Sequence, residues 1–131
     1  MGTRYLLDSN IVIYFQKTIL PPNARSVVQN AIDEDDCFLS IISKMELLGW
    51  NFDNRNQESL TEGFINELNL LNLNEAVVQN TIEIRKKQPK IKLPDAIIGA
   101  TALAHDLILL SRNTSDFVKI DGLRLVNPFD L

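Results

Sequence analysis

The sequence predicts an α/β fold, built as a three-layer sandwich with a mostly parallel sheet between two layers of helices. Short apolar runs alternate along the chain with stretches whose apolar residues recur at helical spacing, a pattern typical of such folds. The composition is that of an ordinary globular protein, with 45% apolar and 23% charged residues. A length of 131 residues without internal repeats predicts a single domain over residues 1–131.

The first predicted strand is the apolar run at residues 5–7. Residues 8–10 (Asp, Ser and Asn) follow it, and because these residue types cap helices, we expect a helix over 11–15. After two prolines, Asn23 is a candidate cap for the next helix. The apolar face of that helix comprises Val27, Val28, Ala31 and Ile32.

The second predicted strand covers residues 37–42, and we expect Ser43 to open a short helix that Gly49 ends. Apolar residues at helical spacing predict another helix over 56–68. The apolar run at 70–73 is a candidate third strand. The predicted inward face of the 56–68 helix comprises Leu60, Phe64, Ile65 and Leu68.

The last part of the chain repeats the alternation of helix and strand. Asn74 is the expected cap of a helix over 75–87. The next helix, 94–105, begins with a proline and is apolar on nearly every side, so we expect it to be buried. Residues 107–110 and 125–126 are the fourth and fifth candidate strands. The predicted inward face of the 75–87 helix comprises Val77, Val78, Thr81 and Ile82.

Four acidic residues occupy corresponding places in this pattern. Asp8 follows the first strand, and Glu46 lies in the short helix after the second. Asp95 opens the buried helix, and Asp116 follows the fourth strand. Because strand carboxyl ends and nearby helix N-termini share one edge of a parallel sheet, these acids are predicted to converge where ligands bind.

Convergence of carboxylates favours a cation. Two carboxylates about 4 Å apart repel each other by roughly 4 kcal/mol at an effective dielectric constant near 20. Several together therefore take up protons or bind a metal ion. One His and one Cys argue against zinc, whereas an all-oxygen site suits Mg²⁺ or Mn²⁺. Such an ion polarises a phosphate and helps to deprotonate water.

The net charge of −4 and pI near 4.9 argue against a passive nucleic-acid binder, which would be basic. An enzyme with a local basic patch is still compatible with this charge. The basic cluster that leads to Asp95 is either a solvated helix end or a contact for a nucleic-acid backbone. It comprises Arg85, Lys86, Lys87, Lys90 and Lys92; Lys44 and Arg112 flank the predicted site and are further candidates for such a contact.

Four short segments occur in order along the chain: residues 6–10 (LLDSN), Ser43 with Glu46, residues 93–102 (LPDAIIGATA) and residues 111–117 (SRNTSDF). Together they resemble the PIN domain family, and within it the VapC-type toxins of toxin–antitoxin pairs. The resemblance extends over the whole chain. It implies a sheet of strand order 3-2-1-4-5 and a metal-dependent endoribonuclease.

The resemblance also implies roles for individual residues. Asp8, Glu46, Asp95 and Asp116 would hold one or two Mg²⁺ or Mn²⁺ ions, with Asp8 and Asp95 as core ligands and Glu46 positioning water. A homodimer inhibited by a cognate antitoxin is expected. The residues that would orient the acids or bind substrate phosphate are Asn10, Ser111 and Asn113.

Other interpretations remain open from the sequence. Asp8 is a candidate helix cap, Ser43 with Glu46 matches a capping box, and Asp116 fits a loop or cap. A receiver-like signalling module also uses acids and Mg²⁺ at the sheet edge, although an acidic pair after the first strand is missing here. A PIN-like fold that only binds partners is the third possibility. Trp50 and Phe52 would pack in the core or bind a partner peptide.

We expect a soluble cytoplasmic protein. Residues 1–14 lack the pattern of a secretory signal, and the most apolar segment, 96–110, is too short to span a membrane. The single Cys37 cannot form an internal disulfide, which favours a reducing compartment.

Overall fold

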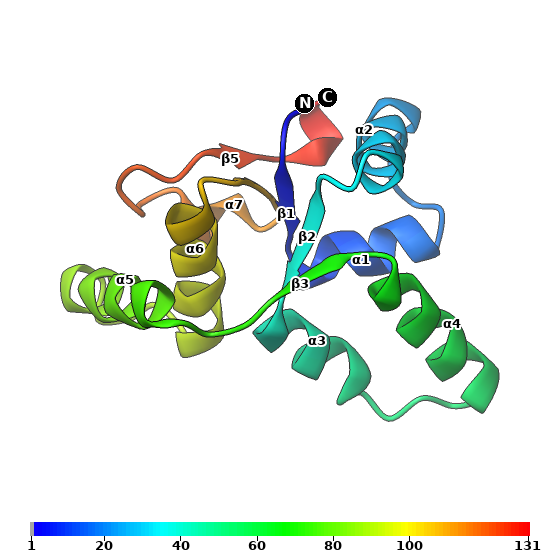
Figure 1. The fold of residues 1–131 in the computed structure, drawn as a ribbon, viewed down its shortest axis with the longest axis horizontal. Coiled ribbons are helices and arrows are strands. Elements are labelled where there is room, and N and C mark those ends of the chain that lie inside the picture. Colours follow the sequence, from blue (N-terminus) through cyan, green and yellow to red (C-terminus); the bar gives the residue numbers. More distant parts are fainter. Residues whose placement is uncertain (1) are drawn as a thin grey trace.

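A computed structural model describes residues 2–131, and within them a five-stranded parallel sheet lies between two groups of helices (Figure 1). The strand order is β3-β2-β1-β4-β5, and all four neighbouring pairs are parallel. The predicted fold class and strand order are therefore confirmed. The strands are β1 (Tyr5–Leu7), β2 (Cys37–Ser40), β3 (Asn69–Leu71), β4 (Ile108–Leu110) and β5 (Leu125–Val126).

The strand order also excludes the receiver-like alternative, because receiver modules have the flavodoxin-like order 2-1-3-4-5. The helices that connect the strands are α1 (Ser9–Gln16), α2 (Pro22–Asp33), α3 (Ile41–Leu48), α4 (Arg55–Asn66), α5 (Glu75–Lys87), α6 (Leu93–His105) and α7 (Thr114–Phe117), followed by a 3₁₀ turn, η1 (Pro128–Asp130). None of these helices within residues 2–131 is both long enough and apolar enough to cross a membrane.

The sheet separates two apolar cores, one on each face. Neighbouring residues of a strand point to opposite faces, so Leu6 and Leu7 of β1, both fully buried, enter different cores. Leu7 packs with side chains of α1, α2 and α4, whereas Leu6 packs with those of α5, α6 and α7. Figure 1 shows the corresponding separation, with α1, α2 and α4 on one side of the sheet and α5, α6 and α7 on the other.

The junction between β2 and α3 differs from the prediction. The strand ends at Ser40, whose side-chain oxygen accepts a hydrogen bond from the Ile42 backbone N–H at 3.2 Å and caps α3. Ser43 is therefore inside the helix and buried, and the expected cap at Ser43 is wrong. The capping-box explanation of Glu46 fails with it, because that motif needs a serine at the cap position.

Helix α2 also begins earlier than predicted. Pro22 is its first residue and Asn23 its second, so Asn23 does not cap the helix. Proline is pre-organised for the first helical position, which explains this start. In α4 the cap is Asn54, which accepts from the Gln57 backbone N–H at 2.8 Å, while the predicted cap Asn74 of α5 is confirmed. The predicted ranges of β1, α5 and β5 are confirmed at both ends, and the remaining element boundaries differ from the predictions by at most two residues, a range in which such boundaries are rarely defined by sequence.

Two predicted inward faces are partly wrong. Leu60 of α4 is 62% exposed, and Val78 and Ile82 of α5 are 40% and 41% exposed. These helices instead bury residues spaced four and three apart, a narrower stripe than predicted. The buried residues are Thr61 and Ile65 in α4, and Val77, Thr81 and Ile84 in α5. Trp50, left open by the sequence, is 72% exposed.

Candidate active site

The register between β1 and β4 brings Asp8 next to Ser111. Leu7 pairs with Leu110, so the residues that follow each strand lie side by side. The Asp8 backbone N–H donates to the Leu110 carbonyl at 2.9 Å, and Ser111 Oγ donates to Asp8 Oδ2 at 2.7 Å. Both side chains are buried at the carboxyl end of the sheet, where the acids were predicted to converge.

The Asp8 carboxylate accepts further hydrogen bonds from the start of α1. The Ser9 backbone N–H donates to Oδ1 at 2.8 Å, which makes Asp8 the N-cap of the helix, and Asn10 Nδ2 donates to Oδ2 at 3.3 Å. Burial nevertheless raises the pKa of Asp8; the bonds from Ser111 and Ser9 oppose the rise, and the nearby negative charge of Asp116 adds to it. Asp8 thus combines the capping role with a place among the acids.

Glu46 lies on the exposed side of α3 and is tied to α1. Ser9 Oγ donates to Glu46 Oε1 at 2.9 Å. The contact joins two helices that follow adjacent strands, because α1 comes after β1 and α3 after β2. Sequence reasoning gave Ser9 a capping role alone; its position directly after Asp8 was the available signal for this link.

The pKa of Asp95 depends on the charges of the other three acids. Asp95 lies in the first turn of α6, and its pKa is raised to about 6, first by burial and then by the negative charges of Asp116, Asp8 and Glu46, in that order. The nearby Lys92 opposes the shift. The negative charges of Asp116, Asp8 and Glu46 therefore lie near enough to Asp95 to disfavour its ionised form.

Asp116 is connected to Asp8 through two polar residues. It lies in the short helix α7, where the sequence left a loop or cap role open, and its carboxylate accepts a hydrogen bond from Asn113 Nδ2. The Asn113 backbone N–H donates to Ser111 Oγ at 3.0 Å, and Ser111 in turn donates to Asp8. Ser111 and Asn113 therefore lie where residues that orient the acids must lie.

Comparison with known proteins identifies the family. Residues 5–123 match the sequence profile of the PIN domain. The chain belongs to the PIN domain family.

Two relatives of this PIN domain are similar over nearly their whole length. The tRNA(fMet)-specific endonuclease VapC of Shigella flexneri is 26% identical over 128 residues, which cover 92% of this chain and 95% of that protein. Ribonuclease VapC1 of Haemophilus influenzae (strain R2866) is 28% identical over 129 residues, which cover 92% and 94%.

Solved structures show the same fold. The chain is similar to one in a toxin–antitoxin complex from Klebsiella pneumoniae, with 30% identity, a TM-score of 0.73 and coverage of 97% of this chain and 99% of that one. It also resembles a chain of DNA-bound VapBC from Salmonella typhimurium, with a TM-score of 0.82, 21% identity and the same coverage. At that lower identity the likeness concerns the fold alone.

The acids of this PIN domain fit a divalent cation by their chemistry. The four carboxylates offer only oxygen, which suits Mg²⁺ or Mn²⁺, and their mutual repulsion is what a cation would relieve. Within residues 2–131, however, no three His, Cys, Asp or Glu side chains are gathered as a ready-made metal cluster. Asp8, Glu46 and Asp116 each accept a hydrogen bond, and because a carboxylate has about four lone-pair sites, each retains free lone pairs for a metal ion.

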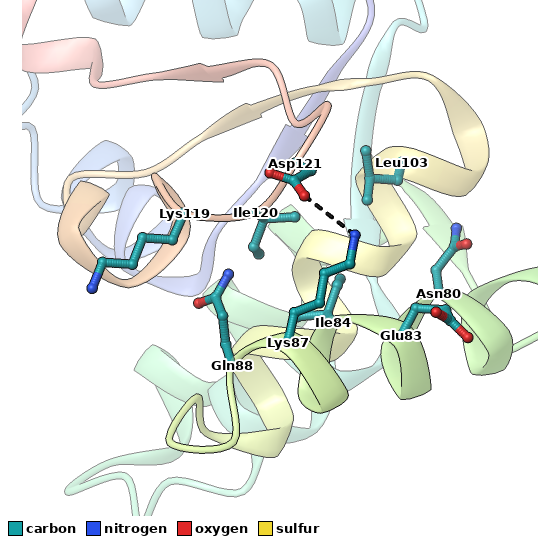
Figure 2. Close-up of a pocket in the computed structure, with 9 residues that line it drawn as sticks. All are labelled: Asn80, Glu83, Ile84, Lys87, Gln88, Leu103, Lys119, Ile120 and Asp121. Atoms are coloured by element: carbon teal, nitrogen blue, oxygen red, sulfur yellow. Dashed lines mark hydrogen bonds and ion pairs between the residues drawn. The ribbon is translucent and has the colours of Figure 1, made fainter.

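The predicted basic residues lie in different surroundings. Lys92 is close enough to Asp95 to lower its pKa, and Lys44 lies in α3 two residues before Glu46. Lys87, by contrast, contacts Asp121, with Nζ 3.3 Å from Oδ2. Figure 2 shows this ion pair across a pocket between α5, α6 and the loop after α7. None of the four acids lines that pocket, so it is separate from the candidate active site.

Proposed function

We propose that this PIN domain protein is a Mg²⁺- or Mn²⁺-dependent endoribonuclease and the toxin of a type II toxin–antitoxin pair. The observation that carries the proposal is the chain of hydrogen bonds that joins Asp8 to Asp116 through Ser111 and Asn113 at the carboxyl edge of the sheet. The negative charges near Asp95, which raise its pKa, support it. Relatives named VapC ribonucleases, matched over nearly the whole chain, support the reaction class.

Asp8 and Asp95 are the proposed core ligands of one or two metal ions, with Asp116 and Glu46 completing the acidic set. The ion would supply Lewis acidity toward the scissile phosphate and the charge that balances the developing oxyanion. Ser111 and Asn113 hold Asp8 and Asp116 in orientation through the hydrogen bonds described above.

Glu46 is the residue proposed to position the attacking water molecule. Its Oε1 accepts from Ser9, and no hydrogen bond to its Oε2 is found among the described residues, so Oε2 is available to orient a water molecule and to accept its proton. In-line attack by that water on phosphorus would leave 5′-phosphate and 3′-hydroxyl ends. Asn10, which contacts Asp8, is a further candidate for phosphate binding.

RNA would approach along the basic residues near the acids: Lys44, Lys92 and Arg112. Their local charge allows a protein of net charge −4 to bind a polyanion, because phosphate contacts act at short range in physiological salt. Each of these side chains is assigned to the RNA backbone rather than to base recognition.

The proposed partners are an antitoxin protein and a second copy of the chain. Exposed apolar side chains of α3, the segment after it and α4 offer a surface for a partner: Met45, Trp50 and Leu60 are 54%, 72% and 62% exposed. We expect the protein to act in the cytoplasm, a reducing compartment in which the buried, unpaired Cys37 stays reduced. A short neighbouring gene whose product neutralises this protein on co-expression would support the pairing.

The decisive experiment is RNA cleavage by the purified protein. We expect cleavage with Mg²⁺ or Mn²⁺, loss of cleavage with EDTA, and loss of activity in Asp8→Asn and Asp95→Asn. Asp53→Asn, an exposed acid outside the site, is the matched control and should cleave normally. Circular dichroism establishes that each variant is folded. Full activity in both folded site variants would overturn the proposed centre, and a folded wild type without metal-dependent cleavage would favour the PIN-like binding protein.

A further inference from the structure

Arg112, directly after Ser111, lies against two aromatic rings. Its Cζ is 4.0 Å from the centroid of the Phe129 ring and 5.5 Å from that of the Tyr14 ring. The two rings themselves meet edge to face, with centroids 5.5 Å apart and planes at 85°. The Arg112 guanidinium, which follows β4, thus contacts one ring from α1 and one from η1.

No carboxylate neutralises this guanidinium within residues 2–131, where the ion pairs are Lys87 with Asp121 and Arg124 with Asp106. Its N–H groups also donate to no acceptor among the described residues, whereas Arg25, which lies over Phe15, donates to the Phe15 carbonyl at 3.0 Å. Aromatic faces support a guanidinium without using its in-plane donors, so the exposed edge of Arg112 is left available to donate to two oxygens of an oxyanion such as phosphate.

The position of the guanidinium relative to the acids follows from α1. The Arg112 backbone N–H faces Asn10 Oδ1 at 3.5 Å, and Asn10 contacts Asp8. Tyr14 comes four residues after Asn10, on the same face of the helix and about 5–6 Å away. Arg112 therefore contacts α1 on the face that also carries Asn10, which is itself in contact with Asp8.

We propose that Tyr14 and Phe129 form an aromatic cage that holds Arg112 ready to bind an RNA phosphate next to the one that is cut. This inference rests on the proposed ribonuclease function and deepens it. Arg112 touches the substrate backbone, whereas Tyr14 and Phe129 are positioning residues. Phe129 lies in η1, whose cap is Asn127, so this 3₁₀ turn helps to position Arg112.

The test compares Arg112→Ala, Phe129→Leu and Phe129→Tyr with the wild type. Binding of the RNA substrate is measured in EDTA over a range of salt concentrations, and KM and kcat are measured with Mg²⁺. Loss of one phosphate contact by Arg112→Ala should weaken RNA binding about tenfold and reduce the slope of log K against log salt by about 0.7, the value for one contact to a single strand.

Phe129→Leu keeps an apolar side chain but removes the aromatic face, so we expect KM to rise by about two- to fivefold with kcat unchanged. Phe129→Tyr retains the ring and should restore the wild-type KM. The matched control is Arg124→Ala, which removes the same charge. Arg124 lies just before β5, at the amino end of the strands, whereas Arg112 lies at their carboxyl end. Arg124→Ala should leave KM and the salt slope unchanged.

Each result has a defined meaning. Arg112→Ala or Phe129→Leu with wild-type affinity and salt slope, in a protein that cleaves RNA and is inactivated by Asp8→Asn, would overturn the cage alone. A wild type that neither binds nor cleaves RNA would overturn both proposals. Thermal unfolding identifies a Phe129 variant that fails to fold, and in that case the exposed Arg112→Ala decides the matter.

Discussion

Ser111 donates its hydroxyl to the Asp8 carboxylate at 2.7 Å, although 103 residues separate the two along the chain. The same oxygen accepts the Asn113 backbone N–H at 3.0 Å, and Asn113 donates to Asp116. One buried hydroxyl thereby couples the acids after β1 and β4. The parallel pairing of Leu7 with Leu110 fixes this relationship, since it aligns the ends of the two strands.

Ser111→Ala should impair catalysis more than folding. It removes one of the bonds that orient Asp8, and loss of such a supporting contact lowers activity about ten- to a hundredfold. Stability should fall by only about 1 kcal/mol. Since the bond also lowers the pKa of Asp8, the acidic limb of the pH–rate profile should move to higher pH. Ser59→Ala, on the exposed side of α4, is the control; equal activity of both variants would contradict the assigned role.

Ser9→Ala should act through Glu46. The substitution leaves the Ser9 backbone bond to Asp8 in place but removes the donor that holds Glu46 Oε1. We expect Ser9→Ala to lower kcat, Glu46→Gln to lower it further, and the double variant to match Glu46→Gln. Steady-state kinetics of this double-mutant cycle provide the measurement. Additive losses in the double variant would show that Ser9 and Glu46 work independently.

The sequence was sufficient to predict that Asp8 and Asp116 lie at the same edge of the sheet, because that depends on topology. Asp8 and Asp116 follow strands that pair in parallel, and any such sheet brings the strand carboxyl ends to one edge. The link between Ser9 and Glu46 was not predictable in this way. It depends on the relative placement of α1 and α3, which tertiary packing determines.

The β2–α3 junction shows why local signals were not sufficient. Ser40 and Ser43 are both good capping residues, so the sequence offers two starting points for one helix. The choice falls on Ser40 because the pairing of β2 with β3 ends there, opposite Leu71. Register with a distant strand therefore decides a boundary that capping preference leaves open.

The exposed face of α5 has a similar origin. Val77 and Val78 are equally apolar, and each begins a stripe at helical spacing that includes an isoleucine, Ile84 in one case and Ile82 in the other. Helix α6, against which α5 packs, is apolar nearly all round and gives no pattern from which to choose. The structure buries Val77, Thr81 and Ile84, and this choice depends on side-chain fit rather than on hydrophobic spacing.

Phe117→Ala should strongly destabilise the fold. Phe117 is fully buried in the core between the sheet, α6 and α7, so truncation leaves a cavity and should lower the free energy of unfolding by about 3–5 kcal/mol. The adjacent Val118 is 67% exposed, and Val118→Ala should change stability by less than about 0.5 kcal/mol. Denaturant unfolding compares the two. Similar losses in both variants would contradict the assignment of Phe117 to the core.

Asp95→Asn should stabilise the protein at neutral pH while removing its activity. Folding raises the pKa of Asp95 from 3.8 to about 6, so the folded state binds this proton more tightly than the unfolded state does. The charged carboxylate therefore opposes folding above the folded-state pKa, and the penalty disappears as the pH falls from about 6 toward 3.8. After allowance for solvent screening of a partly exposed group, we expect Asp95→Asn to gain about 1 kcal/mol at neutral pH.

Mg²⁺ should make the wild type more stable than Asp95→Asn, the reverse of their order without metal. A cation that binds the folded acids stabilises the wild type by mass action, and Asp95→Asn, with one carboxylate fewer, should gain less. Unfolding is followed at about pH 7.5 and about pH 5, each with Mg²⁺ and with EDTA; the advantage of Asp95→Asn in EDTA should shrink at the lower pH. Asp53→Asn supplies the control for removal of an exposed negative charge. Asp95→Asn that is no more stable than the wild type at pH 7.5 would contradict a shared acidic site at Asp95, and so would equal stabilisation of both proteins by Mg²⁺. The reason is that the free-energy penalty of the charged carboxylate and the response to metal both arise from the crowding of carboxylates.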